Sequence, residues 1–364
     1  MKRSYIRKIL DAIDKDTISF AGGLPNEDLF PLKQISKASK KVLKDRSSLQ
    51  YSKSQGIDSL REKIANFYTR VYNLETTKDE ILITTGSQQA FDIILKSLNA
   101  NNLIVESPSY IGALSSFRIL KKDIKEFKTF EQLNNILKKD EILYCISDYQ
   151  NPSTYTYTKK QREKVANILK EKDAYLIEDA AYSLLNFKGK IKKPICSFYK
   201  DKSYHLGTFS KIVAPGLRVG WIRANKELIE KILVVKESLD LHTSTFNQML
   251  IDSYLDDNDL FKHIKKNAKN YKKRMNYMAE CMEKYLPNFE FERPKGGMFI
   301  YGKFNNIKDS MQLATKALEK KVAFVPAQVF YFDEQISNEA RFNFTNCNFK
   351  QTKEGIKILA KLTK

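Results

Sequence analysis

The sequence predicts an α/β protein built on a mainly parallel sheet. From residue 56 to about residue 225, short apolar segments alternate with longer segments of helical apolar spacing. This alternation is typical of strands joined by helices that cover both faces of the sheet. No internal repeat or low-complexity linker interrupts the pattern. The length of 364 residues, 42% of them hydrophobic, is enough for about two domains with a large core.

The expected strands of this region are short and apolar, and most end in a turn with polar residues. In chain order they lie within 80–86, 102–110, 141–152, 174–182, 203–211 and 218–224. The expected helices lie at 56–72, 87–99 and 158–173. In parallel sheets of this kind, ligands bind beyond the carboxyl ends of the strands. The polar turn residues are therefore the candidates for a functional site.

The rest of the chain predicts a second, smaller α+β domain. A long helical stretch covers 225–255, and further strands are expected in 296–304, 322–330 and 339–347. The N-terminal segment has no strand partner of its own and is expected to pack with this part. We therefore predict a large domain at 46–250 and a small domain made of 1–45 and 251–364.

Composition and charge argue against several classes of protein. No apolar run approaches the roughly 18–20 residues of a membrane span, and the basic N-terminus lacks the apolar core of a signal peptide. We expect a cytoplasmic protein. The formal net charge of +20 raises the possibility of nucleic-acid binding. The lysines, however, recur along most helical segments and are mixed with acidic residues, which favours solvated surface charge without a nucleic-acid partner.

The cysteines and histidines are scattered, and no C-x-x-C pair occurs. They are Cys145, Cys196, Cys281, Cys347, His205, His242 and His263. We therefore expect neither a disulfide framework nor a metal site.

Three of the strand-end turns carry residues that would suit a flat, phosphorylated ligand. Ser87 and Gln88 open a helix directly after a strand, where backbone N–H groups attract phosphate, although Ser87 could simply cap the helix. Tyr110 follows the next strand and could stack on a ring or pack in the core. Asn151 precedes Pro152 in what could be a plain turn.

The fourth and fifth turns suggest a reaction. Asp179 ends an apolar strand and is followed by Tyr182; the aspartate could cap a helix or face a cationic ring nitrogen. Lys211 lies among small and apolar residues, unlike most lysines here. Such surroundings would lower its pKa and expose a neutral amine that attacks aldehydes. Arg218 could hold a nearby dianion. Together these groups describe a pocket for pyridoxal phosphate.

Nine segments, in chain order, resemble the pyridoxal-phosphate-dependent aminotransferases of class I/II, which have fold type I. They read TISFAGGLPNEDLFP (17–31), LQYSKSQG (49–56), GSQQAFD (86–92), ESPSY (106–110), QNP (150–152), IEDAAY (177–182), GTFSKIVAPGLRVGW (207–221), RPKGGMFIY (293–301) and ARFNF (340–344). The closest resemblance is to the 2-aminoadipate, kynurenine and aromatic amino acid aminotransferases. It implies a large domain with a mainly parallel seven-stranded sheet, a smaller α+β domain, and a homodimer with shared active sites. It also implies transfer of an amino group between an L-amino acid and a 2-oxo acid such as 2-oxoglutarate.

The resemblance implies a role for each polar residue around the cofactor ring. Lys211 would bind the cofactor aldehyde as an imine, and Asp179 would keep the ring nitrogen protonated. Asn151 and Tyr182 would hydrogen-bond the ring oxygen, and Tyr110 would stack on the ring.

The remaining roles concern the phosphate and the substrate. The residues implied for the phosphate are Ser87, Gln88, Thr208, Arg218 and, from the neighbouring subunit, Tyr51. Arg341 would bind the substrate α-carboxylate, while Gly22 and Gly23 would let the backbone approach the substrate. Arg7 aligns with an arginine that can meet a distal carboxylate in this group, although a surface role is equally compatible with its basic helix.

The sequence departs from the family pattern at three places near the predicted pocket. Asn151 is followed by Pro152-Ser153-Thr154 where the family has Pro-Thr-Gly, Asp148 lies near a position where proline is usual, and Ala327 replaces a glycine.

Three alternative functions stay open. The same lysine and aspartate would also serve a C–S lyase or a decarboxylase. A regulator with an aminotransferase-like domain would need a winged-helix segment, and only about 16 residues precede the first motif. A non-catalytic ligand-binding protein is disfavoured, because every catalytic position is filled.

Overall fold

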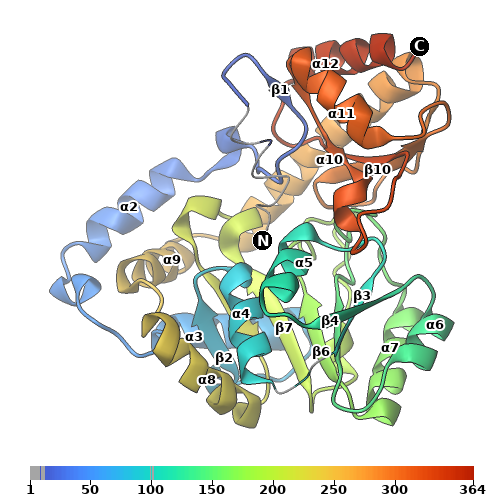
Figure 1. Ribbon diagram of the computed structural model, residues 1–364. Coiled ribbons are helices and arrows are strands. Elements are labelled where there is room, and N and C mark those ends of the chain that lie inside the picture. The colour runs from blue at the N-terminus through green and yellow to red at the C-terminus, as the bar shows by residue number, and fades with distance from the viewer. Residues whose placement is uncertain (1–8, 10–12, 99, 101) are drawn as a thin grey trace.

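The computed structural model describes residues 9, 13–98, 100 and 102–364, and its centre is a seven-stranded sheet (Figure 1). The strand order is β2-β8-β7-β6-β5-β3-β4, and all neighbours run parallel except β8, which is antiparallel to both β2 and β7. The strands are β2 (Ile81–Thr84), β3 (Asn102–Glu106), β4 (Asp123–Phe127), β5 (Ile142–Cys145), β6 (Tyr175–Asp179), β7 (Ser203–Thr208) and β8 (Gly220–Arg223). The α/β fold class is thereby confirmed.

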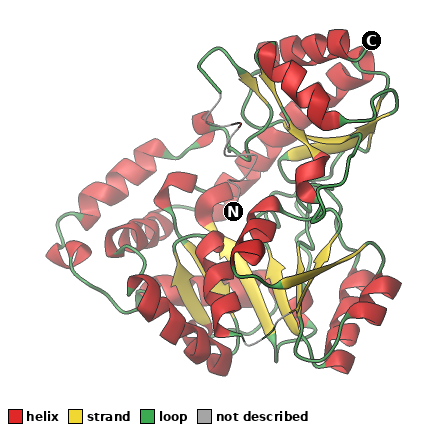
Figure 2. Ribbon diagram, viewed as in Figure 1, coloured by secondary structure: helices red, strands yellow, loops and turns green. Residues whose placement is uncertain are grey.

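Helices cover both faces of this sheet (Figure 2), because successive side chains of its buried strands point to opposite sides. On β3, Leu103 and Val105 belong to one apolar cluster, while Ile104 belongs to a second cluster on the other face. The helices of this region are α3 (Asp58–Phe67), α4 (Ser87–Ser97), α5 (Ile111–Ile119), α6 (Phe130–Ile136), α7 (Lys159–Lys172), α8 (Lys226–Asp240) and α9 (Thr245–Asp257).

Two details of this region differ from the expectation. The segment Asp123–Phe127 forms the edge strand β4, which the pattern did not locate because its sequence, DIKEF, is largely charged. The helical stretch 225–255 is broken into α8 and α9. The break follows Leu241, whose φ of 62° lies in the left-handed region that ends a helix.

The C-terminal part contains a second, antiparallel sheet of order β12-β13-β10-β9. Its strands are β9 (Phe289–Phe291), β10 (Phe299–Phe304), β12 (Val325–Pro326) and β13 (Glu339–Asn343). Three helices accompany it, namely α10 (Leu260–Tyr285), α11 (Ser310–Glu319) and α12 (Phe349–Leu362). These elements form the smaller orange and red body in Figure 1.

The N-terminal segment contacts both bodies. Its strand β1 (Ile18–Ser19) pairs in parallel with β11 (Val322–Ala323) of the C-terminal part. Its helix α2 (Leu32–Val42) packs instead against α9 of the large body (Figure 1). The first contact supports the predicted grouping of residues 1–45 with the C-terminal part, and the boundaries at 45 and 250 stay a proposal. Within the described part of the chain, no helix combines the length and apolar character needed to cross a membrane.

Candidate active site

Lys211 lies at the end of β7, in a short 3-10 turn formed by Phe209–Lys211. Although part of the residue is exposed, its amine is enclosed and donates a hydrogen bond to the carbonyl oxygen of Gly23 over 2.8 Å. Burial, followed by the nearby cations of Arg341 and Arg218, lowers the pKa of Lys211 to about 8, while the carboxylate of Asp179 opposes the shift. The structure therefore gives this lysine the neutral character that its apolar surroundings predict.

Asp179 ends the neighbouring strand β6 and is buried close to Lys211. Its carboxylate accepts hydrogen bonds from the Ala181 amide (3.1 Å) and the Tyr144 hydroxyl (3.2 Å). Burial raises its pKa to about 6, while these donors and the Lys211 charge oppose the shift. A buried carboxylate of this kind is stabilised by a cation placed against it.

Asn151, Tyr182 and Arg341 form a buried chain of hydrogen bonds. The Asn151 amide donates to the Tyr182 hydroxyl over 3.2 Å, and its oxygen accepts from Arg341 Nη1 over 2.7 Å. The three residues come from the turn after β5, the turn after β6 and strand β13, so both sheets contribute. Tyr110, at the start of α5, is close enough to interact electrostatically with Tyr182 and Arg341.

Arg341 is a buried cation that has no counter-ion among the described residues. Only 1% of the residue is exposed, and its second hydrogen bond goes to the neutral carbonyl of Ala21. Its Nε has no partner, and no carboxylate of the described residues forms an ion pair with it. The guanidinium lies over the rings of Phe299 and Phe330, with its central carbon 4.0 and 5.1 Å from the ring centroids. Burial lowers its pKa to about 10. A desolvated arginine of this kind is a receptor for a carboxylate.

A second anion receptor lies at the N-terminus of α4. No side chain caps this helix, which begins at Ser87 after Gly86. The guanidinium of Arg218 lies beside this end, where Nη2 donates to the Thr85 carbonyl (3.2 Å) and Nη1 to Ser210 Oγ (3.4 Å). Thr208 Oγ1 donates to the same serine over 2.9 Å. Helix N–H groups, two hydroxyls and a guanidinium together suit a phosphate dianion.

Comparison with known proteins gives this site its context. A family model described as aminotransferase class I and II matches residues 15–359. The chain belongs to the class I and II aminotransferase family. It is a pyridoxal-phosphate-dependent aminotransferase of fold type I, as the sequence motifs predict.

Named relatives and solved structures extend over the whole chain. Aromatic-amino-acid aminotransferase 1 of Thermococcus litoralis is 34% identical, covering 100% of this chain and 92% of its own. The 2-aminoadipate transaminase of Thermus thermophilus is 30% identical, covering 100% and 94%. A crystal structure of Pyrococcus horikoshii kynurenine aminotransferase, with PMP and kynurenine, has a TM-score of 0.92 and 32% identity, covering 100% of this chain and 95% of that one.

Some expected site residues of this aminotransferase do not join the group within one chain. The Gln88 side chain is exposed and donates to Gly112 O (3.3 Å) and Ser116 Oγ (2.6 Å) on α5. Tyr51 is 78% exposed and packs edge-on against His242. Arg7 lies outside the described residues. Gly22 is buried beside Gly23, whose carbonyl accepts the hydrogen bond from Lys211.

The departures from the family pattern have local structural explanations. Thr154, where glycine is usual, keeps a left-handed φ of 62° and donates its amide to the Gln150 carbonyl over 2.6 Å. Asp148 is buried and forms an ion pair of 2.6 Å with Arg162 on α7. Ala327 is buried in a 3-10 turn, Ala327–Phe330.

Sequence reasoning missed the supporting residues Ser210, Tyr144 and Arg162. Ser210 precedes Lys211 in the same motif, and a hydroxyl at that place is a usable signal. Tyr144 reaches Asp179 from the adjacent strand, and Arg162 reaches the Asn151 turn from a helix. Both depend on spatial neighbours that no local pattern reveals.

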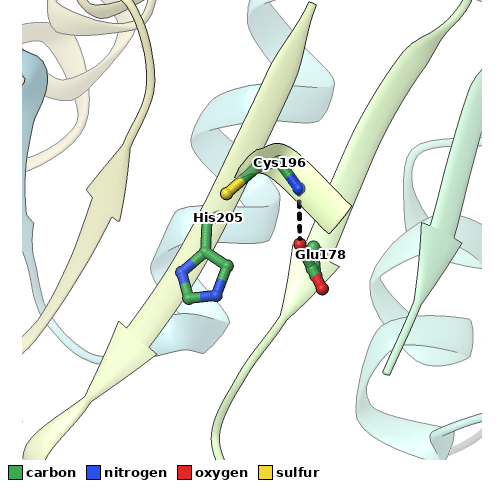
Figure 3. A group of neighbouring side chains, drawn as sticks. All are labelled: Glu178, Cys196 and His205. Atoms are coloured by element: carbon green, nitrogen blue, oxygen red, sulfur yellow. Dashed lines mark hydrogen bonds between the residues drawn. The ribbon is translucent and has the colours of Figure 1, made fainter. Parts of the chain in front are cut away.

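The structure also brings together Glu178, Cys196 and His205, which are potential metal ligands, on the face of the sheet opposite to Asp179 (Figure 3). The Glu178 carboxylate already accepts hydrogen bonds from the amides of Ile195 (3.0 Å) and Cys196 (3.1 Å). Arg162 Nη1 lies 3.9 Å from it. Burial, followed by the cations of Arg223 and Arg162, lowers the pKa of His205 to about 3. Donors and cations therefore satisfy this carboxylate without a metal ion.

Proposed function

We propose that this aminotransferase moves an amino group between an L-amino acid of the 2-aminoadipate or aromatic type and a 2-oxo acid such as 2-oxoglutarate. The observation that carries the proposal is Arg341, a buried cation near both Lys211 and the Asn151–Tyr182 pair that no acid in the described part of the chain neutralises. The names of the relatives, aromatic amino acid, 2-aminoadipate and kynurenine aminotransferases, support the substrate class.

The donor set of the site fits pyridoxal phosphate. Its phosphate would bind the uncapped N-terminus of α4 at Ser87, with Arg218, Ser210 and Thr208. The fit has a local test, since a Cβ built on Gly86 would lie 2.4 Å from Arg218 Nη2, so only glycine leaves the guanidinium at the helix end. Asp179 would face the ring nitrogen, and the raised pKa of its carboxyl suits a partner that supplies positive charge.

The remaining ring contacts would come from Tyr110, Asn151 and Tyr182. Tyr110 would stack on the ring, while Asn151 and Tyr182 would hydrogen-bond its oxygen. For Gln88 we propose a supporting role, because its side chain is engaged with α5.

The cofactor, when bound, acts as an electron sink that stabilises negative charge at the substrate Cα. The protein supplies orientation and proton transfer. Arg341 holds the α-carboxylate with two parallel donors, Nε being unpaired in the structure. Asn151 fixes the Arg341 fork through its 2.7 Å hydrogen bond. Lys211 Nζ, whose pKa is lowered to about 8, is positioned as the base that removes the Cα proton.

We propose a homodimer whose active sites are shared. Apolar side chains are exposed along the same segment as Tyr51, namely Leu24, Leu32, Leu43 and Leu49. Exposed apolar side chains of this kind are suited to burial against a partner subunit. In a dimer that covers this segment, Tyr51 would reach the phosphate in the neighbouring subunit. A cytoplasmic location and the lack of a nucleic-acid partner stay predictions.

A panel of amino donors with 2-oxoglutarate tests the function. L-2-aminoadipate, L-phenylalanine and L-kynurenine should each yield glutamate and the matching 2-oxo acid in equal amounts. Release of carbon dioxide or of a thiol without glutamate would assign a decarboxylase or a lyase instead. The role of Arg7 is tested in the half-reaction without a 2-oxo acid, where each donor alone aminates the cofactor and the absorbance change is followed; Arg7→Ala should weaken glutamate more than phenylalanine as the donor. Equal effects on the two donors would refute that role.

A further inference from the structure

The loop that carries Asn151 is held at both of its ends. It runs from Ser147 to Tyr157, between β5 and α7, and the amide of Tyr157 donates to the carbonyl of Ser147 over 3.0 Å. Inside it, Tyr149 and Thr154 have left-handed φ values of 50° and 62°. Residues in this conformation need surroundings that hold them in place. Asn151 therefore depends on the contacts that fix the ends of the loop.

One buried side chain contacts both ends of the loop, while Lys192 also donates to the Tyr157 carbonyl over 2.8 Å. Arg162 on α7 is only 1% exposed, and its Nε donates to the Tyr157 carbonyl at the far end of the loop (3.2 Å). Its Nη2 donates to the Ser147 carbonyl at the near end, over 2.9 Å. An arginine can do this because its donors are fixed in a planar fork, which a lysine lacks.

Buried acids hold the guanidinium in turn. Asp148 Oδ1 accepts from Arg162 Nη2 over 2.6 Å, and Glu178 lies 3.9 Å from Nη1. Ser147 links the two groups, since its Oγ accepts from Arg162 (3.0 Å) and donates to Glu178 (2.6 Å). Figure 3 shows Glu178 with its amide contact at Cys196. Because Glu178 and Asp179 are successive residues of β6, their side chains point to opposite faces of the sheet. Strand β6 thus presents Asp179 to the candidate active site and the preceding residue, Glu178, to Arg162.

We propose that Arg162 is a positioning residue of this aminotransferase that acts through the 147–157 loop on Asn151. Arg162 forms no hydrogen bond with Lys211 or Arg341. Its influence passes through Asn151, which joins Arg341 Nη1 (2.7 Å) to the Tyr182 hydroxyl (3.2 Å). The inference rests on the proposed role of Arg341 as the carboxylate receptor. When the hydrogen bonds from Arg162 to the loop ends are lost, Asn151 is no longer held in place. The Arg341 guanidinium then loses the hydrogen bond to Asn151 that orients it.

The test uses Arg162→Lys in the full-length holoenzyme, because lysine keeps the charge against Asp148 and Glu178 but not the fork. We expect KM for the amino donor to rise about tenfold, with kcat changed about twofold or less and cofactor content unchanged. Arg223→Lys is the matched control. Arg223 is also 1% exposed and pairs with Glu80 (2.9 Å), but it lies on β8, away from the loop. The Arg223→Lys variant should have the same KM for the amino donor as wild type.

A double-mutant cycle with Asn151→Ala separates positioning from general loss of structure. If Arg162 acts through Asn151, Arg162→Lys should change KM by less than about twofold in the Asn151→Ala background. Independent, multiplying effects would overturn the proposal, and so would a KM within about twofold of wild type for Arg162→Lys alone. Should Arg162→Lys fail to fold, Asp148→Asn is the second variant. It removes the charge of one acid that holds Arg162 and should raise KM in the same direction.

Hydrogen exchange of the loop gives a readout that does not depend on activity. The amides of segment 147–157 should exchange faster in Arg162→Lys apoprotein than in wild type, while the rest of the sheet stays protected. Unchanged exchange rates of these amides would overturn the proposal that Arg162 holds the loop. If Asn151→Ala itself leaves KM unchanged, the proposed role of Asn151 in the function fails, and the exchange result still decides whether Arg162 holds the loop.

Discussion

Arg341 and Asn151 are 190 positions apart, yet the guanidinium of the first donates to the side-chain oxygen of the second over 2.7 Å. One residue belongs to the small antiparallel sheet and the other to a turn of the large parallel sheet. Their hydrogen bond therefore ties the two bodies together at the candidate site. A substrate carboxylate bound by Arg341 would lie at this junction, near Lys211 and Asp179.

Arg341→Lys should strongly weaken binding of the amino donor while the cofactor stays bound. Lysine retains one charge but cannot contact Asn151, Ala21 and a carboxylate with parallel donors. We expect kcat/KM for every amino donor to fall about 100-fold, or about 3 kcal/mol, mainly through KM. Steady-state kinetics check this. Arg293→Lys is the control, because Arg293 pairs with Glu283 at the surface. Equal kinetics for Arg341→Lys and wild type would contradict the carboxylate role.

The lowered pKa of Lys211 predicts how apoenzyme takes up its cofactor. The neutral amine attacks the aldehyde, and its fraction rises with pH up to the pKa of about 8. The rate of pyridoxal phosphate uptake should therefore rise about tenfold from pH 6.5 to 7.5 and level off above about pH 8. Stopped-flow absorbance measures it, and Lys211→Ala should bind no aldehyde covalently and show no turnover. A rate that still climbs at pH 10 would mean an ordinary lysine pKa.

Tyr51 should act in the partner's site if the proposed dimer is right. Lys211→Ala chains still supply Tyr51, and Tyr51→Ala chains still supply Lys211, so a hybrid dimer contains one complete site. Random mixing of equal amounts of the two inactive or impaired variants should restore about a quarter of wild-type activity. Activity is assayed after unfolding and refolding the variants together. Activity no higher than that of the separately refolded parents would place Tyr51 in its own chain's site or outside any site.

Much of the fold and part of the site could be predicted because their signals are local. Apolar runs locate six strands of the large sheet, and each candidate at a strand end is visible as a polar residue after such a run. The edge strand β4 is charged because one side faces solvent, so its pattern resembles a loop. Arg162 looks like any arginine of a basic helix, and only the folded chain shows it buried. The place of Tyr51 depends on a second chain, which no single sequence contains.

The phosphate receptor predicts a contrast between two glycines with positive φ. Gly86 has φ of 77° and Gly189 has φ of 72°, so alanine at either position introduces conformational strain on the order of 1–3 kcal/mol. A Cβ on Gly86 would also lie 2.4 Å from Arg218 Nη2, whereas nothing lies within 4 Å of a Cβ on Gly189. Gly86→Ala must therefore displace the Arg218 guanidinium from the N-terminus of α4.

We expect both variants to melt at a slightly lower temperature and to differ in cofactor affinity. Gly86→Ala should weaken pyridoxal phosphate binding about tenfold or more, since one charge-assisted contact to the phosphate is lost. Gly189→Ala should bind it as wild type does. Equilibrium titration of the two apoproteins, followed by absorbance, makes the comparison between two variants that each place alanine at a positive φ. If the two titrations coincide, Arg218 and the α4 N-terminus do not hold the phosphate together.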